Sequence, residues 1–296
     1  MNQEQLQRIR DDKGFIAALD QSGGSTPKAL ERYGVMEDAY KNEEEMFDCI
    51  HKMRTRIIKS PSFTKENIIG AILFEKTMNS KIDGKYTGDF LWEDKGIVPF
   101  LKVDEGLAEL KDGVQLMKPI KGLDERLASA KEHHIFGTKM RSVIKEYDEK
   151  GIDEIVQQQY EYANRIFEAG FVPIIEPEVD IHAEEKEKIE GYLKKALVRE
   201  LEASDKDKVY MFKLTLPEEK DLYLELYDYP QTLKVVALSG GYTREEANRR
   251  LQENKKIVAS FSRGLTESLM VNQSEEEFDK VLKDSIESIA KAGNDE

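Results

Sequence analysis

Short runs of apolar residues recur along the chain, and longer segments rich in charged residues separate them. The runs have the length and β-branched content of buried strands. They predict eight strands, at 14–19, 67–74, 99–103, 135–140, 172–175, 209–214, 235–238 and 258–261. The segments between them carry apolar residues at helical spacing. They predict helices at 38–59, 153–168, 183–203, 243–254 and 275–292.

The number of strand and helix repeats favours a closed barrel. Alternating strands and helices are typical of parallel βαβ units, and eight of them in 296 residues fit a (β/α)8 TIM barrel. An open doubly wound sheet usually carries a G-x-G-x-x-G motif after its first strand, and this chain has none there. No Pro/Gly/Ser-rich linker or fixed-period repeat divides the chain. We therefore predict one α/β barrel domain over residues 1–296, with more than one helix in the first connection, 21–66.

Composition and charge narrow the class of partner. The hydrophobic fraction is 39%, and the net charge of -14 comes from interspersed acids and bases. Such a surface argues against nucleic acid or membrane as the main partner, although a local basic site can bind phosphate. The polar segment 1–12 lacks the apolar core of a signal peptide, no stretch is long enough to span a membrane, and the one cysteine, Cys49, cannot form an internal disulfide. We expect a cytoplasmic protein; oligomers are possible, and the sequence does not determine the oligomeric state.

Charged side chains stand at the carboxyl ends of several predicted strands, where an α/β barrel builds its active site. Residues two apart in a strand share a face, so one inward register brings these side chains together in the barrel mouth. They are Asp20, Lys102, Lys139, Arg141, Glu176, Glu178 and Lys213.

Lys213 lies inside an apolar run, where an unpaired ammonium is costly and the neutral amine is favoured. A partly deprotonated lysine adds to a carbonyl to form an imine, and nearby cations such as Lys102 and Lys139 promote that state. Glu176 and Asp20 can carry the protons that imine formation and carbon-carbon cleavage require. Because a lone lysine in such a run is usually a snorkelling residue, the hypothesis depends on its position at a strand end.

Glycine and hydroxyl residues follow three of the strands and predict anion-binding loops. The loops after strands seven and eight of this fold commonly bind phosphate, through backbone N–H groups that glycine leaves accessible. The residues there are Ser239, Gly240, Gly241, Ser260, Ser262 and Arg263. A second cluster, with Ser22, Ser25 and the nearby Lys28, follows strand one. Two separate phosphate loops suit a bisphosphate.

The histidines do not predict a metal site. The four of them lack metal-ligand spacing and are His51, His133, His134 and His182. We expect no metal and no cofactor.

Seven short segments together resemble the class I fructose-bisphosphate aldolases, of a bacterial type. Each segment is weak alone, but they occur in the family's order, at 18–25, 101–106, 138–141, 175–178, 212–214, 238–241 and 260–265. The resemblance implies a metal-independent glycolytic and gluconeogenic lyase. Its reaction would be the reversible cleavage of fructose 1,6-bisphosphate to dihydroxyacetone phosphate and glyceraldehyde 3-phosphate through a lysine Schiff base.

The resemblance also implies a role for each candidate residue. Lys213 would form the Schiff base, Glu176 would be the acid/base residue, and Lys139 and Asp20 would assist both steps. The phosphate beside the ketone carbon would be held by Ser239, Gly240, Ser262 and Arg263. The distal phosphate would be held by Ser22, Ser25 and Lys102. Glu178 and Arg141 would position their neighbours. Animal members differ, with glutamate, tryptophan and glycine where this chain has Gln21, Met140 and Ser262.

Three alternatives stay open. A second Schiff-base enzyme class, such as a transaldolase or an aldolase for a singly phosphorylated sugar, would need only one phosphate loop. A metal-dependent aldolase would need clustered histidines to bind its metal. A noncatalytic barrel that binds a phosphorylated ligand would show binding without turnover; the large charged helix surface motivates this hypothesis.

Overall fold

The computed structural model describes residues 1–293, in which eight parallel strands follow one another around a barrel. Their order in the sheet is their order in the chain, so each strand lies beside its predecessor. This is the arrangement of a (β/α)8 TIM barrel, and it confirms the predicted fold class and all eight predicted strands. The strands are β1 (Phe15–Leu19), β2 (Ile68–Leu73), β5 (Val98–Lys102), β7 (Gly137–Ile144), β8 (Val172–Val179), β9 (Tyr210–Thr215), β10 (Thr232–Leu238) and β11 (Ile257–Ala259).

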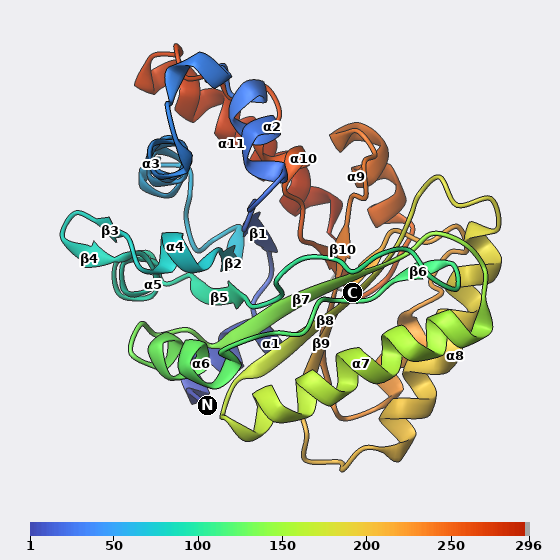
Figure 1. Cartoon of the computed structure of the whole chain (residues 1–296). Helices are drawn as coiled ribbons and strands as arrows, with labels where there is room; N and C mark the ends of the chain where they lie inside the picture. Colours follow the sequence, from blue (N-terminus) through green and yellow to red (C-terminus); the bar gives the residue numbers. More distant parts are fainter. Residues whose placement is uncertain (294–296) are drawn as a thin grey trace.

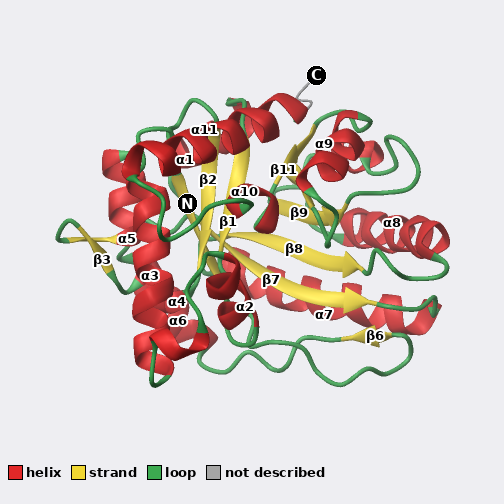
Figure 2. Ribbon diagram, turned by 90° about the horizontal axis from the view of Figure 1, so that it is seen from above, coloured by secondary structure: helices red, strands yellow, loops and turns green. Residues whose placement is uncertain are grey.

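Helices surround the strands, as Figure 2 shows. In Figure 1, α7 and α8 lie along the outside of β7 and β8. The longer helices are α1 (Gln3–Asp11), α2 (Ser25–Arg32), α3 (Glu43–Lys59), α6 (Leu123–Lys131), α7 (Glu149–Glu168), α8 (Lys186–Ala203), α9 (Arg244–Gln252) and α11 (Glu275–Ala292). Short turns of helix are η1 (Glu37–Ala39), α4 (Glu75–Met78), α5 (Thr87–Asp89), η2 (Phe90–Asp94), η3 (Leu224–Asp228) and α10 (Arg263–Thr266).

The predicted helices are present, with some boundaries shifted. Helix α7 begins four residues before the predicted start at 153, because Asp148 caps it by accepting the backbone N–H of Gly151 at 2.7 Å. Helix α3 begins at Glu43 rather than at 38, where Asn42 provides the same kind of cap. The long first connection holds two helices, α2 and α3, as expected.

The apolar residues form two cores, one between the strands and the helices and one inside the barrel. Helix α1 closes the amino-terminal end of the barrel, where Leu6 and Ile9 pack on interior residues of the strands. The side-chain period of two then places polar residues above several of these interior apolar ones. Ile174 of β8 belongs to the interior core, and Glu176 and Glu178 follow on the same face.

The barrel closes at a seam between β11 and β1. These strands lie against each other, but within residues 1–293 no ladder of paired residues joins them. One backbone hydrogen bond, from the N–H of Ala18 to the carbonyl of Phe261 at 3.4 Å, crosses there. The seam therefore depends mainly on side-chain contacts.

Three short strands were not predicted, and β7 and β8 each run four residues past their predicted ends. β3 (Lys81–Ile82) and β4 (Lys85–Tyr86) form an antiparallel hairpin, and β6 (Val114–Gln115) pairs antiparallel with β7. None of these was predicted, because a two-residue strand has no periodicity to detect. β8 continues through Pro177 to Val179, because past Ile175 it pairs with β7 alone, and such an edge tolerates a proline.

A pair of glycines tests the packing of the barrel. A Cβ at Gly137 of β7 would lie 2.2 Å from the carbonyl oxygen of Val172 and 3.0 Å from the ring of Phe100, whereas a Cβ at Gly191 of α8 would meet nothing within 4 Å. Gly137→Ala should lower the free energy of unfolding by about 2–3 kcal/mol through overpacking. Gly191→Ala should raise it by about 0.5–1 kcal/mol, because glycine weakens a helix interior. Urea unfolding of both variants measures this, and equal effects would contradict the packing described.

No helix within residues 1–293 combines the length and the apolar character needed to cross a membrane.

Candidate active site

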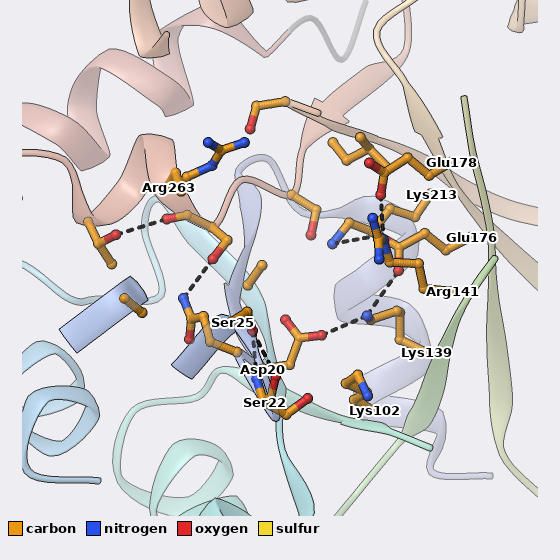
Figure 3. A pocket seen from close by; sticks show the side chains of 18 of the residues that line it. Asp20, Ser22, Ser25, Lys102, Lys139, Arg141, Glu176, Glu178, Lys213 and Arg263 are labelled. Atoms are coloured by element: carbon orange, nitrogen blue, oxygen red, sulfur yellow. Dashed lines mark hydrogen bonds and ion pairs between the residues drawn. The ribbon is translucent and has the colours of Figure 1, made fainter. Parts of the chain in front are cut away.

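A cavity of about 710 Å³ opens at the carboxyl end of the barrel. Every predicted site residue lines it except Gly241. They come from β5, β7, β8 and β9 and from the segments that follow β1, β10 and β11, so parts of the chain far apart in the sequence converge here, as the inward register predicted. Figure 3 shows the charged side chains pointing into this space.

Four charged side chains form a continuous chain of ion pairs at the bottom of the cavity. The Nζ of Lys213 lies 3.2 Å from Oε1 of Glu176, whose Oε2 lies 2.9 Å from Nζ of Lys139. Lys139 in turn lies 2.7 Å from Oδ2 of Asp20. All four are at most 9% exposed, so bulk water screens them little. A proton can therefore pass between Lys213 and Glu176 without leaving the site.

The ionisation of Asp20 and Lys139 is fixed by this pairing. Burial alone would raise the pKa of Asp20, but the cations Lys139 and Lys213 outweigh it, and the pKa lies well below its usual range. Burial alone would lower the pKa of Lys139, but Asp20 and Glu176 outweigh it and raise the pKa. At neutral pH, Lys139 is thus a cation and Asp20 a carboxylate before substrate binds.

A second group of charged side chains lies beside the ion pairs that run from Lys213 to Asp20. Lys102 pairs with Asp104 at 2.9 Å, and Arg141 donates its Nε to Oε2 of Glu178 at 2.5 Å. The backbone N–H of Arg141 also donates to Asp104, at 3.2 Å. Burial would lower the pKa of Arg141, but the hydrogen bond to Glu178 and the charges around it raise the pKa. Each of these two cations is therefore paired with a carboxylate of the same cavity wall.

The loops after β10 and β11 meet at the cavity. Gly240 has a φ of +59°, a conformation that L side chains rarely adopt, and a Cβ there would lie 2.7 Å from Ile181. Gly241 does not line the cavity. It lies behind the lining instead, where a Cβ would come 3.2 Å from the guanidinium of Arg263. Gly240 thus allows the loop to pack closely against Ile181, and Gly241 allows it to pack closely beside Arg263.

The loop after β1 brings Ser22 and Ser25 to the same cavity. The hydroxyl of Ser25 accepts the backbone N–H of Ser22 at 3.0 Å and donates to its carbonyl at 2.9 Å, which fixes the turn into α2. In Figure 3 these serines lie beside Asp20, whereas Arg263 lies across the cavity from Glu178 and Lys213. The two predicted anion-binding loops therefore occupy separate parts of the wall.

Several lining residues were not predicted as site residues. Asp104 follows Phe100 and Lys102 at the same two-residue step, so the alternation of β5 carried a signal for it. Gln21 lies between two predicted site residues, Asp20 and Ser22, but an amide has no distinctive pattern. The rim of the cavity also holds Arg32 of α2, Tyr33 just after it and Thr266 of α10, together with Lys28, which the sequence already placed near the loop after strand one.

The histidines lie outside this cavity. His133 and His134 both approach Asp89, with Nδ1 at 3.7 Å and 2.8 Å from its oxygens, and His51 contacts the carbonyl of Lys81 at 3.1 Å. In the described part of the chain, no three His, Cys, Asp or Glu side chains are grouped so that they could hold a metal ion.

Comparisons with known proteins agree with this architecture. The family model of the class-I fructose-bisphosphate aldolases matches residues 3–211, a range that ends just before Lys213. Among solved structures, the fructose-bisphosphate aldolase of Plasmodium falciparum, in a ternary complex with TRAP and a small-molecule inhibitor, has the same fold with a TM-score of 0.73. The match has 23% sequence identity and covers 97% of this chain and 92% of that one. Because the family model covers more than half of the chain, the chain belongs to the class I fructose-bisphosphate aldolase family.

Proposed function

We propose that the chain cleaves fructose 1,6-bisphosphate reversibly to dihydroxyacetone phosphate and glyceraldehyde 3-phosphate, through a Schiff base on Lys213. The observation that carries the proposal is the buried chain of ion pairs from Lys213 through Glu176 and Lys139 to Asp20, in a cavity that is also lined by the two loops predicted to bind anions. A carbonyl compound with a phosphate at each end fits this combination of groups.

Lys213 is the best nucleophile among the three lysines that the strands bring to the cavity, one each on β5, β7 and β9. The ammonium of Lys139 contacts two carboxylates, and its raised pKa keeps it protonated. Lys102 is held by both the carboxylate and the main-chain carbonyl of Asp104. Lys213 has one carboxylate contact, Glu176, which can take up the proton that an amine must lose before it attacks.

The first half of the reaction forms the Schiff base. The neutral amine of Lys213 adds to the ketone carbon, and the carbonyl oxygen becomes the hydroxyl of a carbinolamine. Glu176 gives a proton to that hydroxyl, which leaves as water, and the nitrogen lone pair forms the C=N bond of an iminium ion. Lys139 lies within 2.9 Å of Glu176 and stabilises its carboxylate form between proton transfers.

The second half breaks the carbon-carbon bond. The iminium ion is an electron sink, so it accepts the electron pair of the C3–C4 bond and becomes an enamine. Asp20, ionised at neutral pH because of its low pKa, takes the proton of the C4 hydroxyl, and glyceraldehyde 3-phosphate leaves. A proton then returns to C3, water hydrolyses the imine, and dihydroxyacetone phosphate is released.

The two loops hold the two phosphates. Arg263, Ser262 and the Ser239–Gly240 turn would bind the phosphate beside the ketone carbon, since a guanidinium and backbone N–H groups suit an oxyanion. Ser22, Ser25 and Lys102 would bind the distal phosphate. Glu178 and Arg141, paired with each other, would support the wall between them.

Turnover assays in chelator test the proposal and separate its rivals. With EDTA present, the protein should cleave fructose 1,6-bisphosphate at an undiminished rate, because Schiff-base chemistry takes its electron sink from the iminium ion. Fructose 1-phosphate should be a poorer substrate by about tenfold or more, since it leaves the distal loop empty. Loss of activity in EDTA that a divalent cation restores would favour a metal-dependent aldolase. Equal kcat/KM for the two sugars would favour an enzyme for singly phosphorylated substrates.

We further propose that residues 1–296 form one barrel domain that works in the cytoplasm on sugar phosphates, in glycolysis and gluconeogenesis. The continuous order of the strands and the absence of an apolar spanning helix in residues 1–293 support this. Cell fractionation that recovers the protein mainly with membranes would contradict the location.

A further inference from the structure

Arg54 is a buried cation that the proposed reaction does not use. Its side chain, on α3, has no exposed surface. Nη1 donates to the hydroxyl of Thr77 at 2.6 Å, and Nη2 donates to both the main-chain carbonyl and the side-chain oxygen of Gln21, the latter at 3.2 Å. These acceptors are neutral. Burial lowers the pKa of Arg54 to about 10, which still leaves it charged at neutral pH.

A buried charge depends on its hydrogen bonds, so Arg54 restrains the groups that accept them. Gln21 is the group that matters for the cavity. Its side-chain oxygen faces Arg54, and its amide Nε2 donates to the hydroxyl of Ser262 at 2.6 Å. An amide has one accepting end and one donating end, so both ends of Gln21 are used.

This chain of contacts crosses the seam of the barrel. Gln21 lies just beyond the end of β1, and Ser262 lies just beyond the end of β11. One backbone hydrogen bond joins the two strands below them, from Ala18 to Phe261. The hydrogen bond between Gln21 and Ser262 is therefore a second link, placed at the mouth of the barrel.

The same contacts connect the two anion-binding loops. Ser22 follows Gln21 directly, with Ser25 three residues further on, and Arg263 follows Ser262 directly. All of these residues line the cavity. The hydrogen bond that holds Gln21 against Ser262 therefore also sets the distance between the loop after β1 and the loop after β11.

We propose that Arg54, Gln21 and Ser262 form a clamp across the barrel seam, which sets the distance between the two phosphate-binding loops and makes the site selective for a substrate with a phosphate at each end. Arg54 and Gln21 are positioning residues in this arrangement. The inference rests on the proposed function, because it assigns one phosphate to each loop.

The clamp should affect a ligand that contacts both loops differently from a ligand that contacts only one. A ligand held by one loop moves with that loop and does not sense the distance to the other. A ligand held by both loops does sense that distance, and it binds less well when the loops are free to drift apart. Loss of the clamp should therefore weaken the binding of a bisphosphate far more than that of a monophosphate.

The experiment compares KM and kcat for fructose 1,6-bisphosphate and fructose 1-phosphate in full-length wild type and variants. Gln21→Met keeps the length of the side chain and removes both hydrogen bonds. It should raise KM for the bisphosphate about 5- to 10-fold, the value of roughly one hydrogen bond, and change KM for the monophosphate by less than about 2-fold. The kcat for the bisphosphate should stay within about 2-fold, since the ion-pair chain from Lys213 to Asp20 is untouched.

Two further variants complete the design. Gln21→Glu keeps an oxygen for Arg54 and can accept a hydrogen bond from the Ser262 hydroxyl, so it should restore KM for the bisphosphate to within about 2-fold of wild type. Gln7→Met is the matched control, because Gln7 is exposed on α1 at the opposite end of the barrel. It should change neither KM.

The outcomes separate the clamp from the proposed function. If Gln21→Met raises KM for both sugars by the same factor, Gln21 serves one phosphate only and the clamp is wrong. If it raises neither, the clamp has no role in binding. If the wild type itself fails to turn over the bisphosphate, the proposed function is wrong and the assigned role of the clamp falls with it.

Discussion

Lys213→Met is expected to lower kcat by at least about 10³-fold, because it removes the amine that becomes the Schiff base. Methionine has nearly the same length and suits the buried, apolar surroundings of this strand position, where Lys213 is 4% exposed. The fold should therefore survive, and near-unchanged KM or ligand binding would accompany the loss of turnover. Steady-state cleavage of fructose 1,6-bisphosphate, with a thermal unfolding curve for each protein, measures the effect.

A lysine on the surface provides the control for that variant. Lys195 lies exposed on α8, so Lys195→Met should leave kcat unchanged. If Lys213→Met retained more than about a tenth of wild-type kcat, the covalent step could not pass through Lys213.

Glu176→Gln is expected to lower kcat by about 10²–10⁴-fold, the usual contribution of a positioned acid/base group. Glutamine keeps the shape of the side chain but cannot take up or release the proton exchanged with Lys213. The change also removes the carboxylate between Lys213 and Lys139, whose nitrogens lie 3.2 and 2.9 Å from its oxygens. Two ammonium groups would then face each other without the charge that separates them.

Glu178→Gln is the matched comparison, since Glu178 lies on the same strand two residues later and pairs with Arg141. It contacts neither Lys213 nor Lys139 within ion-pair distance, and its loss should lower kcat by no more than about tenfold. Equal losses from the two variants would contradict the assignment of the acid/base role to Glu176.

The centre of the candidate site could be predicted because its signals are local. Successive side chains of a strand point alternately into and out of the barrel. The inward-pointing side chains of all eight strands therefore meet in one interior. Met211 lies in the interior core, so Lys213 had to point inward, and the same step leads from Ile174 to Glu176. The positions of the strands themselves could be predicted from their short apolar runs.

The clamp could not be predicted because its signals are not local. Arg54 lies on a helix among charged neighbours, a pattern that is typical of an exposed face. Its burial arises only where α3 meets the loop after β1 and helix α4, in which Gln21 and Thr77 accept its hydrogen bonds. The same limit applies to the seam, because no residue pattern in β1 or β11 indicates how those two strands meet.

The central claim is that Lys213 forms a covalent imine with the substrate. The most direct test is the intact mass of the protein after borohydride reduction in the presence of dihydroxyacetone phosphate and EDTA, followed by peptide mapping. We expect one adduct of reduced dihydroxyacetone phosphate per chain, located on Lys213 and absent from Lys213→Met. A wild-type protein that binds the ligand but gains no mass, or an adduct that maps to Lys102 or Lys139, would contradict it.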